Sequence, residues 1–138
     1  MAHIDSAELR LVIGRLSRRI RQERAEGEVS DGQRAVLFRL HDAGPQTLGA
    51  LAEHERVTPP SMNRTVGVLV ERGYLSRRPA TDDARRVTIE LTETGRRWAR
   101  ETRRRRDEWF AVRLAALEPA ERELLERAAP VLRKLADS

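Results

Sequence analysis

The sequence contains no cysteine, few aromatic residues and one lysine among its many basic residues. The absence of cysteine excludes disulfide bonds, thiolate metal sites and cysteine nucleophiles. No apolar run approaches the roughly 18 residues that a membrane-spanning helix needs. The start, Met1 to Asp5, has neither the basic nor the apolar part of a secretory signal. These absences predict a cytoplasmic, disulfide-free protein with no membrane partner.

The charge of the chain is uneven along its length. Its 138 residues suffice for one compact domain, and 36% of them are charged. The net charge is +5, but residues 56–106 alone hold 14 arginines against 6 acidic residues, a net charge of +8. Residues 1–55 carry a net charge of −1 and residues 107–138 carry −2. A central basic block of this kind favours a polyanionic partner.

No arrangement of residues in the sequence suggests catalysis. There is no glycine-rich phosphate loop, no nucleophile elbow and no pair of carboxylates with a histidine partner. We therefore expect no enzyme, no catalytic residue and no cofactor. The histidines, His3, His41 and His54, lack the spacing of a strong metal site, so we also expect no bound metal. An alternative role for His41 is to line an effector cavity.

Apolar residues at helical spacing predict six helices. We expect them over about residues 6–25, from Ser30 to Gly44, over 48–54, from Thr58 to Gly73, over 93–117 and from Pro119 onward. Ser30, Thr47 and Thr58 are the predicted N-caps, because their side-chain oxygens can accept free backbone N–H groups. Gly27 lies in the predicted break after the first helix, and Pro130 is expected to kink the last one.

A β-hairpin is predicted between the fourth and fifth helices. Residues 74–78 have the composition of a short strand, and residues 87–91 alternate apolar and polar side chains as a half-buried strand does. Residues 79–84 form a turn-rich loop between them, and Thr92 can cap the helix that follows. The chain is therefore expected to be mainly α-helical with a small β-hairpin wing.

The order of short helix, turn, second helix and ribbon is that of a winged helix-turn-helix, whose second helix enters the major groove of DNA. The side chains expected to face DNA from this helix are Pro60, Ser61, Asn63, Arg64, Thr65 and Val68. Arg64 can pair with guanine, Ser61 can bond a base or phosphate, and Val68 can touch a thymine methyl. Asn63 and Thr65, on the flanks, can reach sugar or phosphate. Met62 and Val66 point to the core.

Three stretches also carry a family resemblance. Asp83-Ala84-Arg85, followed by the alternating residues 87–92 and by Gly95, has the pattern Asp-x-Arg and then Leu-Thr-x-x-Gly. Together with Ser61-Met62-Asn63-Arg64 and residues 69–74, it resembles the wing and recognition helix of the MarR family, bacterial transcription regulators named for multiple antibiotic resistance. The resemblance covers nearly the whole chain.

The resemblance implies roles for particular wing residues. Arg85 would be the wing arginine that enters the minor groove, and Asp83 the carboxylate that holds the wing tip in shape. Ala84 stands where a second basic residue is frequent in the family, so the wing is expected to carry its charge on Arg85 and Arg86. Gly67 and Val68 also depart from the family, which often has polar or charged residues at these positions. The candidates for phosphate contacts are Thr47, Arg77 and Arg78.

The family also implies a homodimer built from the N-terminal helix and the two C-terminal helices. The sequence supports this independently, because the helices at both ends carry apolar stripes that one small domain has little core to cover. We therefore predict a dimerisation helix in residues 1–29, a DNA-binding domain in 30–92 and dimerisation helices in 93–138.

The predicted function is a transcription regulator that represses by binding a palindromic operator. By resemblance, a small aromatic or phenolic ligand releases it, from a pocket between the helical arms and the wing domain that includes His41 and Trp98. For Trp98 and Trp109, core or interface packing is the alternative to ligand stacking. The arginines of residues 103–106 are expected to be solvated or paired with acids. The alternative function is a sequence-tolerant architectural protein of the nucleoid, which would show far less than a ~10³-fold preference for specific DNA.

Overall fold

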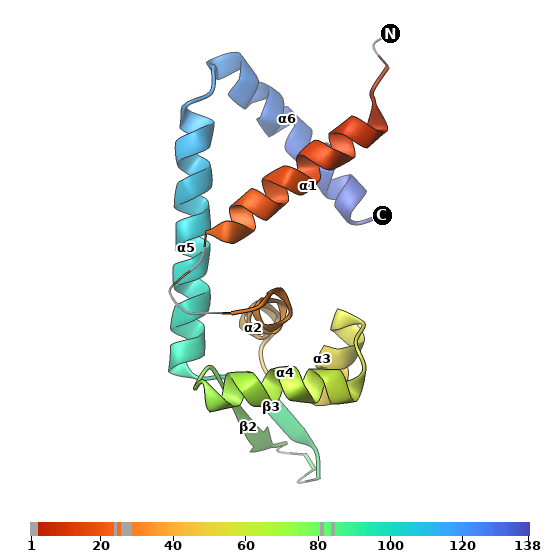
Figure 1. Cartoon of the computed structure of the whole chain (residues 1–138), viewed down its shortest axis with the longest axis vertical. Helices are drawn as coiled ribbons and strands as arrows, with labels where there is room; N and C mark the ends of the chain where they lie inside the picture. Colours follow the sequence, from red (N-terminus) through yellow and green to blue (C-terminus); the bar gives the residue numbers. More distant parts are fainter. Residues whose placement is uncertain (1–2, 24, 26–28, 81, 84) are drawn as a thin grey trace. The chain divides into compact units, whose positions relative to one another are not determined.

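The protein was analysed as a computed structural model that describes residues 3–23, 25, 29–80, 82–83 and 85–138. Within these residues the chain forms two compact units: a central unit, Ala25–Arg103, and a terminal unit, Met1–Arg24 with Arg104–Ser138. The elements are α1 (Ser6–Gln22), α2 (Asp31–Ala43), β1 (Gln46–Thr47), α3 (Leu48–Glu55), α4 (Pro59–Glu71), β2 (Leu75–Pro79), β3 (Val87–Leu91), α5 (Glu93–Ala115) and α6 (Pro119–Ala136) (Figure 1). The expectation of a mainly helical chain with a small wing is confirmed.

Three helices begin where their capping residues predict. The side chains of Ser30, Thr47 and Thr58 each accept a hydrogen bond from the backbone N–H three residues later, at 3.2, 3.1 and 3.3 Å. Such a bond satisfies one of the donors that a helix start leaves unpaired. Pro59 and Pro60 occupy the first two positions of α4, where a missing N–H costs nothing.

Helix ends are less well predicted than helix starts. The first helix, expected to reach residue 25, ends at Gln22, and Glu23 is already extended. Beyond this end, the backbone N–H of Ala25 donates to Thr102 Oγ1 at 3.1 Å, a tertiary contact that helical periodicity does not predict. Gly73 follows the end of α4 with a φ of +82°, the left-handed conformation expected of it. The break at Gly27 and the wing residue Ala84 lie outside the described residues.

The sheet has three strands rather than the expected two. The hairpin strands were predicted within one residue, but β1 was missed; it pairs antiparallel with β3, so the strand order is β1-β3-β2. Gln46 lies opposite Ile89 and Thr47 opposite Thr88. A two-residue strand is too short to show an alternation of apolar and polar side chains, so periodicity does not predict it.

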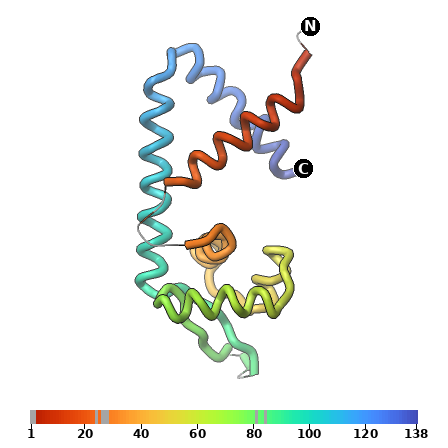
Figure 2. Tube along the Cα trace, viewed as in Figure 1, coloured from red at the N-terminus to blue at the C-terminus, as the bar shows by residue number. Residues whose placement is uncertain are grey.

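The core of the central unit receives side chains from α2, α3, α4, β2, β3 and α5. Its most deeply buried large apolar side chains are Val36, Leu37, Leu51, Val66, Leu69 and Ile89. Met62 and Val66 face this core, as predicted for the inner side of α4. Trp98 is 4% exposed and packs against the rings of Phe38 and Tyr74, with centroids 5.5 and 6.5 Å away. Figure 2 shows α4 lying across the base of the hairpin, which extends away from the helices.

The start of α5 is tied to the exit of α4 by a set of short contacts that we call the Thr92 junction (Gly73, Tyr74, Thr92 and Gly95). The N–H of Thr92 donates to the carbonyl oxygen of Tyr74 at 3.0 Å, and its hydroxyl donates to that of Gly73 at 2.5 Å. The same hydroxyl oxygen accepts the N–H of Gly95 at 3.1 Å, so Thr92 caps α5 as expected. A Cβ on Gly95 would overlap the Tyr74 carbonyl oxygen.

A second contact joins α2 to the middle of α5. Arg103 lies 2.7 Å from a carboxylate oxygen of Asp42, and its guanidinium stands over the ring of Phe38 at 5.1 Å. The hydrogen bond from Arg103 is the main reason why the pKa of Asp42 is lowered. Arg104, in the terminal unit, pairs with Glu108 at 3.0 Å. The expectation of acid pairing in the arginine run is confirmed for these two residues.

The terminal unit leaves its apolar side chains uncovered. Neither α1 nor α6 contains a buried residue. The exposed large apolar side chains of the two helices are Leu9, Leu11, Val12, Ile13 and Leu16 on α1, and Leu124, Leu125, Val131, Leu132 and Leu135 on α6. Trp109 is held between two guanidinium groups, with Arg19 4.7 Å and Arg113 4.2 Å from its ring centroid.

Helix α6 continues through Pro130 to Ala136. The kink expected at Pro130 stays a prediction. Among the described residues, none of the helices is both long enough and apolar enough to cross a membrane.

The Thr92 junction predicts that Gly95→Ala destabilises the protein. Because the new methyl group would meet a backbone carbonyl, the start of α5 must shift, which costs about 1–3 kcal/mol. Urea denaturation followed by circular dichroism measures the free energy of unfolding. Gly49→Ala, near the start of α3 where a Cβ meets nothing within 4 Å, is the control and should not destabilise. Equal effects of the two substitutions would contradict this packing.

The Asp42 pair predicts a pH-dependent contribution to stability. Because folding lowers the pKa of Asp42, the contribution is present above the unfolded value of 3.8 and is lost as the pH falls through the lowered value. Exposed pairs contribute about 0.2–1 kcal/mol. The difference in unfolding free energy between the wild type and Asp42→Asn should therefore be present at neutral pH and vanish in strong acid. A difference that persists unchanged in strong acid would refute this interpretation.

Candidate nucleic-acid interface

Helices α3 and α4 form the helix-turn-helix of the central unit. Arg56 ends α3 in the left-handed conformation with a φ of 55°, and its N–H donates back to the carbonyl oxygen of Glu53 at 3.2 Å. The N–H of Val57 donates to the carbonyl oxygen of Ala52 at 3.0 Å, and Thr58 then caps α4. These backbone bonds let the chain reverse in three residues and fix where α4 begins.

The outer face of α4 carries the side chains that are predicted from the sequence to face DNA. Pro60, Asn63, Arg64 and Val68 are exposed, and Ser61 and Thr65 are half-buried. The hydroxyl of Thr65 donates to the carbonyl oxygen of Ser61 at 3.3 Å, so it is already bonded within the helix. Arg64 makes no hydrogen bond or ion pair with any part of the chain that the structure describes. Its guanidinium is therefore free for an external acceptor.

The wing tip is held by backbone hydrogen bonds. One side-chain carboxylate oxygen of Asp83 accepts a hydrogen bond from the N–H of Arg85 at 2.9 Å. The backbone carbonyl oxygen of Asp83 accepts one from the N–H of Arg86 at 3.0 Å. Asp83 thus shapes the loop that presents both arginines. The side chain of Arg86 pairs with Asp82 at 3.2 Å, whereas that of Arg85 is exposed and makes no ion pair with a described residue.

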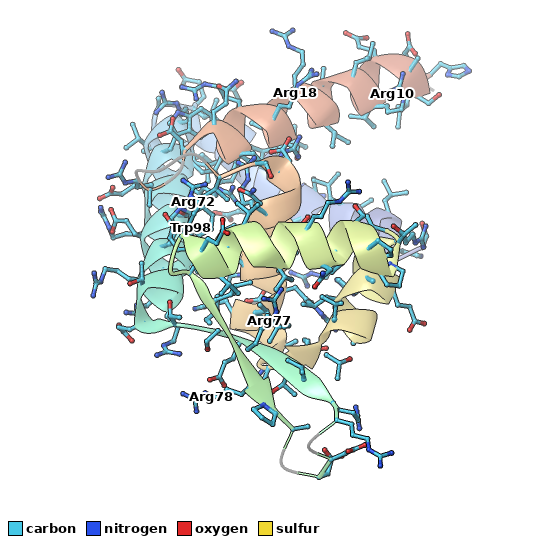
Figure 3. All side chains as sticks on the ribbon, turned by 60° about the horizontal axis from the view of Figure 1, so that its bottom comes forward. Arg10, Arg18, Arg72, Arg77, Arg78 and Trp98 are labelled. Carbon is cyan, nitrogen blue, oxygen red and sulfur yellow. The ribbon has the colours of Figure 1, made fainter. Side chains whose placement is uncertain are left out.

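Arg77 and Arg78 follow one another on β2 and point to opposite sides, as successive strand residues do. Arg77 lies beside α4, whereas Arg78 projects away from it (Figure 3). Arg77 Nη2 donates to Asn63 Oδ1 at 3.3 Å, and Arg78 Nε lies 2.6 Å from Glu90 on β3. Thr47, the third phosphate candidate, is half-buried and caps α3.

The two residues predicted for an effector pocket lie in different surroundings. His41 borders a pocket of about 290 Å³ in the central unit, together with Leu40, Gly44, Pro45, Glu90, Leu91 and Arg96. Trp98 lies in the core instead and has little surface to offer a ligand. In the described part of the chain, no three His, Cys, Asp or Glu side chains gather to hold a metal ion.

The structure adds contacts that reasoning from the sequence missed. The bond from Arg77 to Asn63 joins the wing strand to α4, and the pair of Arg78 with Glu90 joins the two hairpin strands. The alternation of side chains along 74–78 already separates Arg77 from Arg78. The alternation does not predict where α4 lies relative to the strand, because that position depends on tertiary packing.

The outer face of α4 and the wing together form one basic surface, which we call the α4–wing surface. Its arginines are Arg64, Arg77, Arg78, Arg85 and Arg86, all of them exposed. The two that have acidic partners keep more than half of their side-chain surface in solvent, 70% for Arg78 and 56% for Arg86. Such a surface, with a helix and a ribbon side by side, suits the phosphate backbone and the grooves of double-stranded DNA.

Comparisons with known proteins agree with this geometry. The MarR family model matches residues 29–87. An uncharacterized HTH-type transcriptional regulator of Mycobacterium bovis, Mb0904, is 39% identical over 132 residues, which are 96% of this chain and 92% of that protein. The HTH-type transcriptional repressor YetL of Bacillus subtilis is 34% identical over 70 residues, 49% of this chain and 42% of that protein.

A solved structure extends the likeness to the fold. The crystal structure of a transcriptional regulator protein from Pseudomonas aeruginosa matches with a TM-score of 0.85 and 31% identity, covering 96% of this chain and 94% of that one. The residues that the family model matches, 29–87, include α4, β2 and the loop at the wing tip, which carry the arginines of the α4–wing surface. The chain therefore belongs to the MarR family of winged-helix transcription regulators, which bind DNA and are not enzymes.

Proposed function

We propose that the protein is a repressor that binds a palindromic operator sequence-specifically as a homodimer. The observation that carries the proposal is the unpaired guanidinium of Arg64 on the exposed face of α4, beside a wing that presents Arg85. A free arginine on a recognition helix can read guanine, which an architectural protein has no need to do. The partial likeness to a repressor of Bacillus subtilis favours repression over activation.

In this proposal α4 lies in the major groove and the wing in the adjacent minor groove. Arg64 pairs with guanine, while Pro60, Ser61, Thr65 and Val68 meet base edges or sugar around it. Arg85 enters the minor groove, where a narrow groove concentrates negative potential. Asp83 keeps the tip in shape, and Arg86 lies beside it. The side chains proposed to contact phosphates of the DNA backbone are those of Thr47, Arg77 and Arg78.

The homodimer follows from the uncovered apolar side chains of the terminal unit. A second copy of the chain offers the same apolar stripes, so a symmetric interface would cover both sets at once. We assign dimerisation to residues 1–29 and 93–138 and DNA binding to residues 30–92. Two copies would then read half-sites whose centres are about 10 bp apart.

Release by a small aromatic or phenolic ligand stays a prediction of the family resemblance. The pocket beside His41, of about 290 Å³, lies at the small end of the range for ligand sites, about 300–1,000 Å³. Its size suits a ligand of one ring. Arg96, which lines it, is already bonded to Glu93 and to the carbonyl oxygen of Leu91.

Arg64→Ala and Arg85→Ala should weaken binding in different ways. Loss of Arg64 should relax base preference in the half-site and cost about 1–3 kcal/mol of binding free energy. Loss of Arg85 should act chiefly on sequences whose flanking minor groove is narrow. Selection from a random duplex library, followed by affinity measurements on the selected sites, tests both expectations.

Arg64→Lys is the matched control, because it keeps the charge and loses the planar fork with which arginine pairs with guanine. It should weaken the preference for guanine and keep the salt dependence of the wild type. Equal weakening on all sequences by both alanine substitutions would contradict the division of roles. A wild type that prefers no sequence would instead support the architectural alternative.

Leu16→Glu on α1 and Leu132→Glu on α6 should each turn the dimer into a monomer. Both side chains are more than two-fifths exposed in the single chain, at 44% and 41%, so the charge does not disturb a core but would be buried in the dimer. Sedimentation at micromolar concentration measures the change. Val57→Glu, which is 41% exposed in the turn before α4, is the control and should leave the dimer intact. A monomeric wild type would refute the assignment.

A further inference from the structure

One side chain of the wing strand makes a hydrogen bond to the recognition helix. Arg77 Nη2 on β2 donates to Asn63 Oδ1 on α4 at 3.3 Å, across a span of 14 residues. Figure 3 shows Arg77 beside α4, while its neighbour Arg78 points away. Both partners of this bond are exposed, so it lies at the α4–wing surface and does not belong to the core. Its location is therefore where the protein would meet DNA.

Gly67 lies beside the guanidinium of Arg77. It follows Asn63 by four residues on the same face of α4. A Cβ built on Gly67 would lie 4.0 Å from Arg77 Nη2, an ordinary van der Waals distance, so a methyl group there would contact the guanidinium without displacing it. Glycine inside a helix costs about 1 kcal/mol relative to alanine. The departure of Gly67 from the family pattern thus coincides with the path of Arg77.

The chemistry of the two groups fixes the orientation of the Asn63 amide. An asparagine side chain has one acceptor oxygen and one donor nitrogen, whereas a guanidinium has only donors. The end of the amide that faces Arg77 must therefore be the oxygen. The amide nitrogen is left to face outward, and it can only donate.

A free asparagine reads adenine by using both ends, the oxygen accepting from N6 and the nitrogen donating to N7. We propose that Arg77 is a positioning residue that disfavours this pairing. To pair with adenine, the amide oxygen turned toward Arg77 would have to accept from N6 as well, whereas the amide nitrogen remains able to donate. Asn63 therefore favours guanine, whose major-groove edge has the acceptors N7 and O6, over adenine, whose N6 amino group is itself a donor. This inference rests on the proposed placement of α4 in the major groove.

The test compares base preference among full-length variants. Wild type, Arg77→Met, Asn63→Ala and the double variant are each measured on a selected operator in which every position is changed to all four base pairs. At the position that Asn63→Ala alters, Arg77→Met should lower the guanine-over-adenine preference about 5-fold or more. In the Asn63→Ala background, Arg77→Met should leave that preference unchanged.

Arg78→Met is the matched control. It removes the same charge from the next residue of the same strand, and Arg78 contacts Glu90 rather than α4. It should weaken binding by a similar factor on all sequences, as loss of a phosphate contact does. If Arg77→Met does not fold, Arg77→Lys, which keeps a donor there, is used instead and should retain the guanine preference.

Three results would overturn the inference. Uniform weakening by Arg77→Met on all sequences would make Arg77 a phosphate contact only. If Arg77→Met still changes the base preference in the Asn63→Ala background, Arg77 acts on the base itself. If Asn63→Ala leaves the base preference unaltered, Asn63 reads no base. A wild type without any base preference would refute the proposed function, and this inference would fall with it.

Discussion

The arrangement of α4, the hairpin and α5 depends on the carbonyl oxygen of Tyr74, which accepts a hydrogen bond from the N–H of Thr92. The bond holds the exit of α4 against the point where the sheet ends and α5 begins. Gly95 permits the close approach, because any side chain there would collide with the same carbonyl. The recognition helix, the hairpin and α5 therefore keep one geometry, and the Leu-Thr-x-x-Gly pattern of the sequence has a steric cause.

A second organising feature is the division of the arginines into paired and unpaired groups. Arg78 and Arg103 contact carboxylates on neighbouring elements, and Arg86 contacts one within its own loop at the wing tip. Arg64 and Arg85 make no such pair within the described residues and point to solvent. Arg77 stands between these classes, because its partner is a neutral amide on the helix proposed to read DNA. Composition alone cannot separate these roles.

Much of the fold could be predicted from the sequence because its signals are local. Ser30, Thr47 and Thr58 cap helices by bonds to residues three positions away, and the alternation over 87–91 marks a strand. What could not be predicted depends on distant partners. The backbone N–H of Ala25, after the end of α1, donates to the hydroxyl oxygen of Thr102, which is distant in the sequence.

The candidate site divides in the same way. Helical periodicity places Arg64 on the outer face of α4, whereas the contact of Arg77 with Asn63 needs two elements packed together. The burial of Trp98 also follows from packing, with Phe38 and Tyr74 as its neighbours. The periodicity of α5 does not distinguish a core tryptophan from one that lines a pocket.

The basic α4–wing surface owes all of its positive charge to guanidinium groups. Arginine does not lose its proton in proteins at any ordinary pH, unlike a lysine or histidine in a perturbed site. The one lysine, Lys134, lies in α6 and not on this surface. Acetylation of lysine therefore has no target on this surface, and its guanidinium groups keep their positive charge in mild acid and in mild alkali. Ionic strength, which screens charge without altering it, is the variable to which such a surface responds.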